Sequence, residues 1–242
     1  MASYEKKIRK LVEKLTRTRI CLLYTKGFYG LLLMRMTYAL DTDCHNMRSD
    51  GRRIVFHPDF LEALSDQELE YCLTHQILHV ALRHIKRREG RVEDQWDRAC
   101  DIVVNSILRE ESGIDITLQG RECPHLAPSG KEGCLYSVEE VYRMLGERKE
   151  KKGGQENNIS SDRQKDMLAE GRWDDHSTWG SEGSMEENMI EKVEWEQQIV
   201  EANRRADQKS TAWGGPPKYI QRYLDDLNEG QLDWRGLLAQ FI

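Results

Sequence analysis

Residues 64–88 read LSDQELEYCLTHQILHVALRHIKRR, and they predict one long helix that begins at Ser65 and runs to about residue 88. The start is well marked, because Ser65 and Glu68 have the spacing of a capping box, in which each side chain bonds the backbone N–H of the other residue. Apolar residues then recur at helical spacing, which predicts that one broad face of the helix packs against a core.

Two histidines in this helix are candidate metal ligands. In His75-Gln76-Ile77-Leu78-His79 the histidines stand four residues apart, so both imidazoles face one point. They lie at the margin of the apolar face, where a core holds a side chain rigidly beside a cleft. A histidine pair at this spacing is weak evidence alone, because it also occurs by chance on helix surfaces.

A third candidate ligand lies on the next predicted helix, residues 94–110. Asp101 falls at the edge of its apolar stripe, where a carboxylate can complete a zinc site with two histidines. The alternative is an acid that only interacts with the helix dipole. Asp97, which is nearer the start of the helix, fits that alternative better. The sequence therefore predicts His75, His79 and Asp101 as the metal ligands.

A longer stretch, Leu64 to Leu108, resembles the metallopeptidase domain found in front of a VWA-like domain in bacterial proteins. In that family the motif reads HE[IV]LHVALRH and is followed by a helix with the pattern W-N-x-A-x-D-x-x-x-N. This chain has HQILHVALRH and then WDRACDIVVN. The resemblance also covers RRIVFHPDFL (52–61) and GGPPKYIQRYLDDL…LDWRGLLAQFI (214–242), and so most of the chain outside 146–170.

The resemblance implies a minimal zincin, in which helices pack on a small sheet and His75, His79 and Asp101 hold Zn²⁺. It implies cleavage of a protein or peptide, and an AAA ATPase or a VWA-like domain as a further partner. In the family the VWA-like domain directly follows the D-W-R-x-L-L element. This chain ends there, at Ile242, so we expect a protein trimmed to its peptidase domain or a stand-alone relative.

Gln76 is the departure from the family motif. In an HExxH peptidase the glutamate accepts a proton from the attacking water and passes it to the leaving amine. Gln76 can hydrogen-bond that water but cannot accept its proton. Zinc binding should survive, because the glutamate is not a ligand, while turnover should fall by about 10²–10⁴-fold. The sequence therefore predicts an endopeptidase domain that is inactive as written.

Three functional hypotheses stay open. Gln76 can be an engineered change that traps substrate or prevents self-cleavage, which we favour because the rest of the site is maintained. It can instead mark a natural pseudopeptidase that binds peptides without cutting them. The third hypothesis is a structural interaction domain that holds no metal.

The rest of the chain predicts an α+β fold, a mostly helical zincin-like domain with a small sheet whose edge strand borders the active-site helix. Residues 52–57 are predicted to be a strand at a sheet edge, because Pro58 cannot donate to a ladder. Helices are predicted at 3–18, 27–40, 94–110, 137–147 and 185–209, with two short helices at the end.

The predicted organisation has three parts. Residues 1–145 form the zincin-like core, 146–171 a flexible insertion, and 172–242 the helical C-terminal part of the same domain. The insertion is predicted because residues 146–171 hold almost no apolar side chains and cannot bury enough surface to order themselves.

A polar and aromatic cluster, Trp173-Asp174-Asp175-His176-Ser177-Thr178-Trp179, follows the insertion. His176 is a tentative catalytic residue, either as an additional ligand or as a donor to the oxyanion of the tetrahedral intermediate. The alternative is a loop anchor whose tryptophans pack. His84 is predicted to face away from His75, and His57 to be a surface residue at the strand end. Cys123 and Cys134 bracket a loop that contains His125, and this loop can be a second metal site, a disulfide or a plain loop; we favour the plain loop in a cytosolic chain.

Bulk composition excludes some classes of function. The net charge of −6 argues against a nucleic-acid binder, which carries a basic excess. No apolar run approaches the ~20 residues that cross a bilayer, and the start lacks a secretory signal, so we expect a cytoplasmic protein without membrane partners. The six cysteines include no CxxC pair, which fits reduced thiols.

Overall fold

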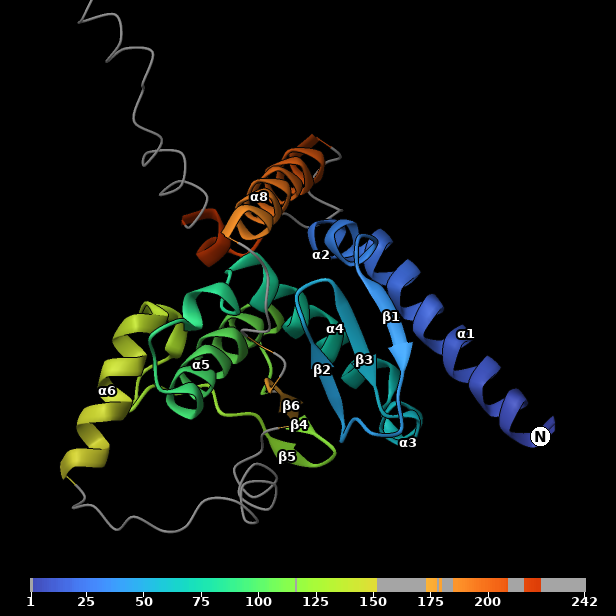
Figure 1. Cartoon of the computed structure of the whole chain (residues 1–242), viewed down its shortest axis with the longest axis horizontal. Coiled ribbons are helices and arrows are strands. Elements are labelled where there is room, and N and C mark those ends of the chain that lie inside the picture. The colour runs from blue at the N-terminus through green and yellow to red at the C-terminus, as the bar shows by residue number, and fades with distance from the viewer. Residues whose placement is uncertain are drawn as a thin grey trace, which may run out of the picture.

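A computed structural model describes residues 2–115, 117–151, 173–177, 179, 185–208 and 216–222. It has an α+β fold in which helices predominate over a small mixed sheet, as predicted. In the view of Figure 1, α1 (Ala2–Thr25) lies to the right of the strands, and α5 (Glu93–Ser112) with α6 (Val138–Lys151) lies to their left. The predicted insertion lies outside the described residues, except that 146–151 continue α6.

The main sheet has four short strands in the order β1-β3-β2-β6. β1 (Thr37–Leu40) runs parallel to β3 (Arg53–Phe56), and β2 (Met47–Ser49) runs antiparallel to β3. β6 (Asp174–Asp175) joins the other side of β2 in parallel. A segment distant in the sequence therefore supplies one edge of the sheet. A separate hairpin pairs β4 (Thr117–Leu118) with β5 (Arg121–Glu122).

The prediction that residues 52–57 form an edge strand was wrong, because β3 has a partner on each side. Pro58 comes after the last ladder residue and is the first residue of α3 (Pro58–Ala63). The N–H at this helix position has no intrahelical partner, so proline loses no hydrogen bond there. His57 caps this helix through a hydrogen bond from the Asp59 N–H to its Nδ1, 3.1 Å long. The edge strand that borders the helix with His75 and His79 is instead β6, where Asp174 accepts a hydrogen bond from Gln76.

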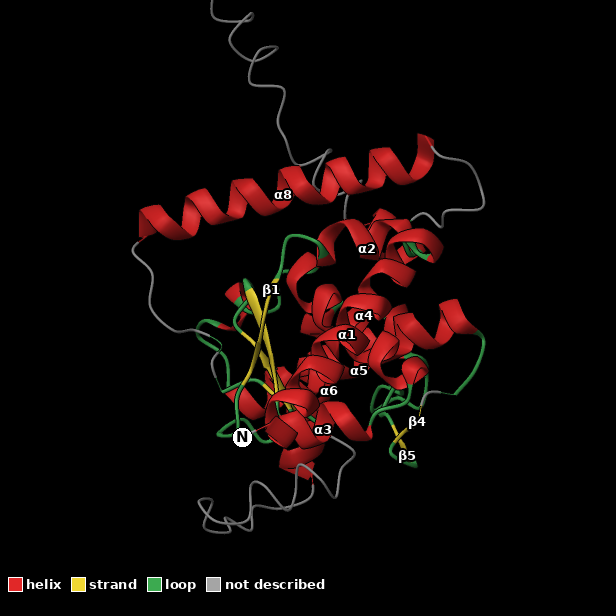
Figure 2. Ribbon diagram, turned by 90° about the vertical axis from the view of Figure 1, so that its right-hand side faces the viewer, coloured by secondary structure: helices red, strands yellow, loops and turns green. Residues whose placement is uncertain are grey.

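α4 (Asp66–Ala81) is the histidine helix, and it contacts α1 (Ala2–Thr25), α2 (Gly27–Leu33), α5 (Glu93–Ser112) and α8 (Met185–Gln208). Figure 2 shows α1, α4 and α5 on one side of the sheet, with α8 crossing beyond its end. The predicted capping box is present: Ser65 Oγ accepts from Glu68 N and the Glu68 carboxylate accepts from Ser65 N. Most of α4 is buried, so its side chains are held firmly.

α4 ends earlier than predicted, at Ala81 instead of about residue 88. Arg83 has a left-handed backbone with φ of 58°, which breaks the helix. The last predicted turn is the separate 3₁₀ turn η1 (Lys86–Arg88). This reversal turns the chain back toward the histidines.

The predicted helix at 27–40 is half wrong, because α2 stops at Leu33 and β1 follows. An apolar run does not distinguish a buried helix from a buried strand by itself. Residues 37–40 form a strand because they pair with β3, where Tyr38 and Leu40 lie opposite Ile54 and Phe56.

The remaining predicted helices are present, although α1 continues to Thr25, well past the predicted end at residue 18. α5 covers the predicted 94–110 and ends at Gly113 in a left-handed C-cap. α6 begins directly after Ser137, whose Oγ accepts from the Glu140 N–H and whose N–H donates to the Glu140 carboxylate. α8 covers 185–208 of the predicted 185–209, and of the predicted C-terminal helices only the part at 218–222 is described. No helix among the described residues could span a membrane.

Gly30 sets how closely α2 approaches α1. A Cβ at this position would collide with the backbone of Leu23. Gly30→Ala should therefore destabilise the fold by about 1–3 kcal/mol, the usual cost of overpacking a core, despite the better helix propensity of alanine. Urea unfolding measures this. Gly146→Ala is the matched control, since its Cβ meets only the flexible Gln95 side chain; equal effects of the two variants would contradict the argument.

Candidate metal centre

Two imidazoles from α4 converge on one point. The Nε2 atoms of His75 and His79 are 2.8 Å apart, and each side chain is 1% exposed. The four-residue spacing on a rigid, well-capped helix produces this arrangement, as predicted from the sequence. Burial, with the neighbouring His75, His84 and His176, lowers the pKa of His79 well below its ordinary value. His79 is therefore neutral at pH 7, the state that binds a metal.

Asp101 reaches the same point from α5. Its Oδ1 lies 3.7 Å from His75 Nε2 and 3.5 Å from His79 Nε2, and the residue is buried. The structure thus brings together the three residues that the sequence singles out as ligands. Asp97, one turn earlier, does not join them, because its Oδ2 pairs with Arg88 Nη2 at 3.3 Å.

A second carboxylate enters from β6. Asp174 Oδ2 lies 3.7 Å from His75 Nε2, and Asp174 is 2% exposed. One donor atom from each of His75, His79, Asp101 and Asp174 lies within 4.8 Å of the others. Sequence reasoning missed Asp174, although it marked the surrounding cluster, because no helical spacing connects β6 to α4.

His176, the tentative catalytic residue, lies beside Asp174. Its Nε2 is 2.7 Å from Asp174 Oδ2 and 3.6 Å from Asp101 Oδ1. Burial alone lowers the pKa of His176, but the carboxylates of Asp174, Asp101 and Asp97 raise it to about 9. His176 therefore acts in this arrangement as a donor to Asp174. Trp179 stacks on its ring, with centroids 3.7 Å apart.

Gln76 points to the same place as the ligand candidates. Its Nε2 donates a hydrogen bond to Asp174 Oδ2, and the residue is completely buried. Several polar atoms here are buried without a hydrogen-bond partner among the described residues: His75 Nδ1, Gln76 Oε1 and Asp174 Oδ1. Burying a polar atom without a hydrogen-bond partner destabilises a protein. The unsatisfied atoms and the converging donors together therefore fit a site that holds a metal ion.

The prediction that His84 stays away from this site was wrong. His84 Nδ1 lies 3.2 Å from His79 Nδ1, and both residues are buried. The helical projection fails because α4 ends at Ala81 and the turn at Arg83 swings His84 back. Its carbonyl accepts from Trp96 Nε1 at 3.0 Å. His84 thus orients the imidazole of His79, the usual task of a partner behind a metal ligand.

Arg88 fixes the segment that carries His176. Its Nη1 donates to the carbonyl oxygens of His176 and Trp179, each at 2.9 Å, while its Nη2 pairs with Asp97.

Two tryptophans pack against the histidines of α4. Trp173 meets the ring of His75 edge-on, with ring centroids 4.7 Å apart. The ring centroids of Trp179 and His79 are 5.1 Å apart. A tryptophan therefore packs against each histidine of α4.

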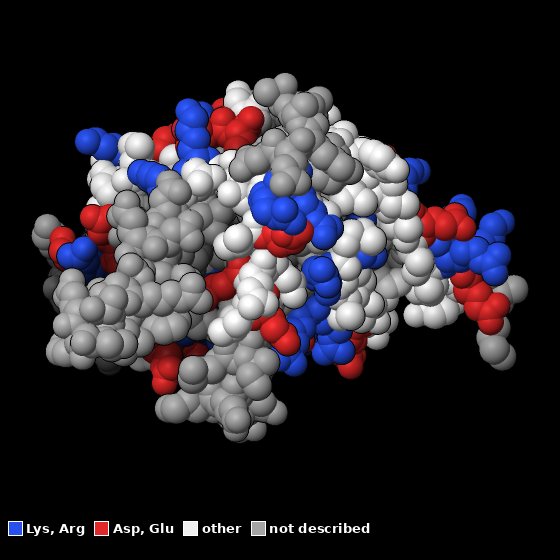
Figure 3. Space-filling view, turned by 90° about the horizontal axis from the view of Figure 1, so that it is seen from above, with Lys and Arg blue, Asp and Glu red and all other residues white. Residues whose placement is uncertain are grey.

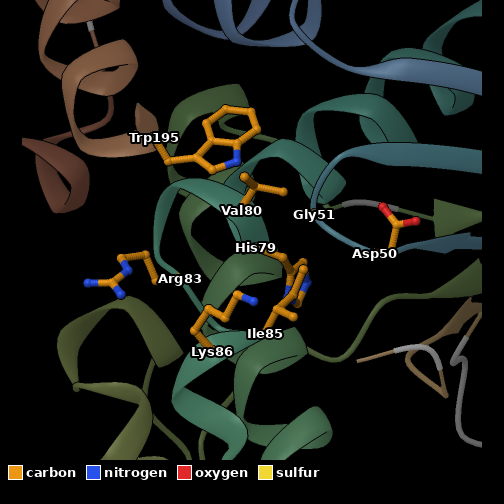
Figure 4. Close-up of a pocket in the computed structure, with 8 residues that line it drawn as sticks. All are labelled: Asp50, Gly51, His79, Val80, Arg83, Ile85, Lys86 and Trp195. Atoms are coloured by element: carbon orange, nitrogen blue, oxygen red, sulfur yellow. The ribbon is translucent and has the colours of Figure 1, made fainter. Parts of the chain in front are cut away.

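A small pocket opens beside His79. The residues labelled in Figure 4 line it, and they come from the β2–β3 turn, the end of α4, the turn that follows α4 with the start of η1, and α8: Asp50, Gly51, His79, Val80, Arg83, Ile85, Lys86 and Trp195. Of the four residues grouped around the candidate metal position, only His79 lines this pocket. It does not reach Asp101 or Asp174.

The other sequence candidates lie elsewhere. His125 pairs with Glu132 through Nδ1 at 3.1 Å, and Cys123 and Cys134 are both free thiols, as are the remaining four cysteines. Burial raises the pKa of Cys123 and Cys134, which favours inert core thiols. On the face in Figure 3, basic and acidic side chains lie side by side.

Comparison with known proteins agrees with this geometry. No curated protein and no solved structure matches the chain. One family matches residues 11–242, which include all the elements around the site, and its description is "Putative metallopeptidase domain". The chain therefore belongs to this metallopeptidase domain family.

Proposed function

We propose that the protein is a zinc-dependent endopeptidase domain, with His75, His79 and Asp101 as zinc ligands and an extended protein or peptide as substrate. As written, with Gln76, it binds substrate and does not cut it. One observation carries the proposal: two Nε2 atoms and one carboxylate oxygen converge in a buried site, beside the side chain at position 76.

The donor set fits zinc. Zinc binds imidazole nitrogen and carboxylate oxygen at about 2.0–2.2 Å in a tetrahedron, which separates neighbouring donors by about 3.3–3.6 Å. The two distances to Asp101, 3.5 and 3.7 Å, are close to that range. The histidine pair at 2.8 Å is somewhat closer, a difference that a small rotation of either ring covers. His84 behind His79 supplies the second contact that zinc-bound histidines normally have.

A bound zinc ion would polarise the scissile carbonyl and make a water more acidic. The protein must then supply a group that accepts the proton from the water and delivers it to the leaving amine. Gln76 occupies the place for that group but has no basic atom. Binding and orientation of the peptide are unaffected by this change, whereas proton transfer is lost.

A specific contact also favours the second hypothesis, a natural binding-only protein. Gln76 donates to Asp174 in a fully buried position. A glutamate at position 76 would place two carboxylates against each other, which is unfavourable unless they share a proton or a cation. The amide therefore matches its present neighbour. The predicted association with a VWA-like domain or an AAA ATPase stays a prediction.

Metal analysis tests the proposal. After dialysis against zinc and desalting, the protein should contain one zinc per chain, and His75→Ala and His79→Ala should contain none. A parent chain that retains no zinc would leave only the hypothesis of an interaction domain without metal.

Asp101→Ala should weaken zinc binding by more than the 10–100-fold that loss of a supporting residue costs, because it removes a ligand. Competition with a chromophoric chelator measures the dissociation constant. Glu110→Ala is the control, since Glu110 lies on the same helix but is exposed. If Asp101→Ala bound zinc like the parent, Asp101 would not be the third ligand and Asp174 would take its place.

A further inference from the structure

The centre described above is closed. His75, Gln76, His79 and Asp174 are each 2% exposed or less, and Asp101 is 7% exposed. A catalytic zinc keeps one position open for water or substrate. The pocket beside His79 does not reach His75, Asp101 or Asp174, so a peptide bond cannot reach the grouped donors while the surrounding side chains stay where they are.

One segment provides most of this closure. Residues 173–177 together with Trp179, here called the covering segment, bring Trp173 over His75, Asp174 among the metal donors, and Trp179 over His79. Gln76, on α4, and His84, in the turn after α4, also contact the site, and both are completely buried. The covering segment is therefore the part whose displacement would expose the donors without unfolding the domain.

The backbone of the covering segment binds as a peptide would. Its β6 residues add to β2 as a two-residue parallel strand, with Asp174 opposite Met47 and Asp175 opposite Arg48. Without β6, β2 would be an open sheet edge beside α4, and open edges accept extended peptides by strand addition. The covering segment thus fills both the ladder positions and the metal-facing space.

The side chain that enters the site defines the chemistry of the occupant. Asp174 Oδ2 accepts from Gln76 Nε2 and lies 3.7 Å from His75 Nε2, while its buried Oδ1 has no hydrogen-bond partner among the described residues. The Asp174 carboxylate therefore has one oxygen, Oδ2, beside the histidine donors and a second oxygen without a partner among the described residues, which suits it to coordinate a metal ion. Asp175, the next residue, is half-buried and accepts from the Ser177 N–H, so it does not share this role.

We infer that the covering segment is an internal substitute for the substrate: it occupies the β2 edge and the open metal position, and an acidic extended peptide displaces it. This inference rests on the proposed function and adds how the site is regulated and which class of peptide it takes. Peptides with Asp or Glu at the position that faces the metal compete best.

The test uses the full chain and a fluorescein-labelled synthetic peptide of residues 171–181, with fluorescence anisotropy as the readout. The double variant Asp174→Ala/His176→Ala removes both metal-facing groups of the covering segment and leaves His75, His79 and Asp101. The matched control, Asp175→Ala/Ser177→Ala, changes two polar residues of the same segment that are not buried. Zinc content and thermal melting are measured for each protein.

With zinc bound, the double variant should bind the peptide at least tenfold more tightly than the parent or the control variant. A labelled peptide in which Asp174 is alanine should lose most of that gain. Asp174→Asn, which keeps the side-chain shape, should give a smaller increase in affinity for the peptide. It replaces the double variant in the test if the double variant does not fold.

Two outcomes would overturn the inference, and they are distinguishable. If the variants fold and bind zinc but take up the peptide no better than the parent, the covering segment is a permanent part of the site and the proposed function survives. If the parent binds no zinc, the proposed function itself fails, and the inference fails with it.

Discussion

Gln76→Glu should raise peptide-bond hydrolysis by the zinc-loaded protein by about 10²–10⁴-fold, the usual contribution of general acid–base catalysis. The carboxylate would lie where the Gln76 amide now lies, within reach of the same neighbours, and would provide the missing proton acceptor. Hydrolysis of dye-quenched casein, a substrate with an extended chain, measures the effect. The same change with His79→Ala should show no hydrolysis, which controls for a contaminating protease.

Because Gln76 contacts Asp174, hydrolysis should also be measured in a variant that lacks the Asp174 carboxylate. Glutamate at position 76 faces the Asp174 carboxylate, so Gln76→Glu should also be assayed together with Asp174→Ala and His176→Ala. Hydrolysis in either background supports the endopeptidase proposal. Absence of hydrolysis in both, with zinc bound, would contradict it and leave a protein that binds peptides without cutting them.

Zinc should stabilise the folded chain strongly. A ligand that binds only the native state adds about 4 kcal/mol at a free concentration 1,000 times its dissociation constant. For a chain of 242 residues, this corresponds to a rise in Tm of roughly 8–16 °C. The physical reason is that the four converging donors are brought together only by folding, since they come from α4, α5 and β6.

Differential scanning calorimetry with and without zinc measures this shift. His79→Ala removes one donor and should abolish the shift while the capped helix remains. Magnesium at the same concentration is a second control, because it prefers oxygen ligands and octahedral geometry. Equal Tm values for the parent with zinc and with magnesium would contradict a specific zinc site.

The sequence was sufficient wherever local physics decides the structure. The Ser65–Glu68 cap, the four-residue spacing of His75 and His79, and the position of Asp101 on the next helix follow from helix geometry, and the structure brings these residues together. They are contacts within one helix or between consecutive helices.

Nonlocal contacts were out of reach. β6 pairs with β2 across more than a hundred residues, so nothing near Asp174 indicates that its carboxylate enters the site. The split of residues 27–40 into α2 and β1 depends on pairing with β3. The placement of His84 depends on a left-handed residue, Arg83, which is not a residue type that favours this conformation. Each error has the same origin, a tertiary contact that outweighs the local pattern.

The distance along the chain between α5 and the covering segment has a consequence for synthesis. The ribosome releases His75, His79 and Asp101 first, and Trp173 follows 72 residues after Asp101. At about 5–20 residues per second, this delay is roughly 4–14 s. A nascent chain whose α4 and α5 have already docked therefore offers three donors to the surrounding solution before its own cover exists. The order of translation thus gives a metal ion its opportunity to enter a site that the finished chain closes.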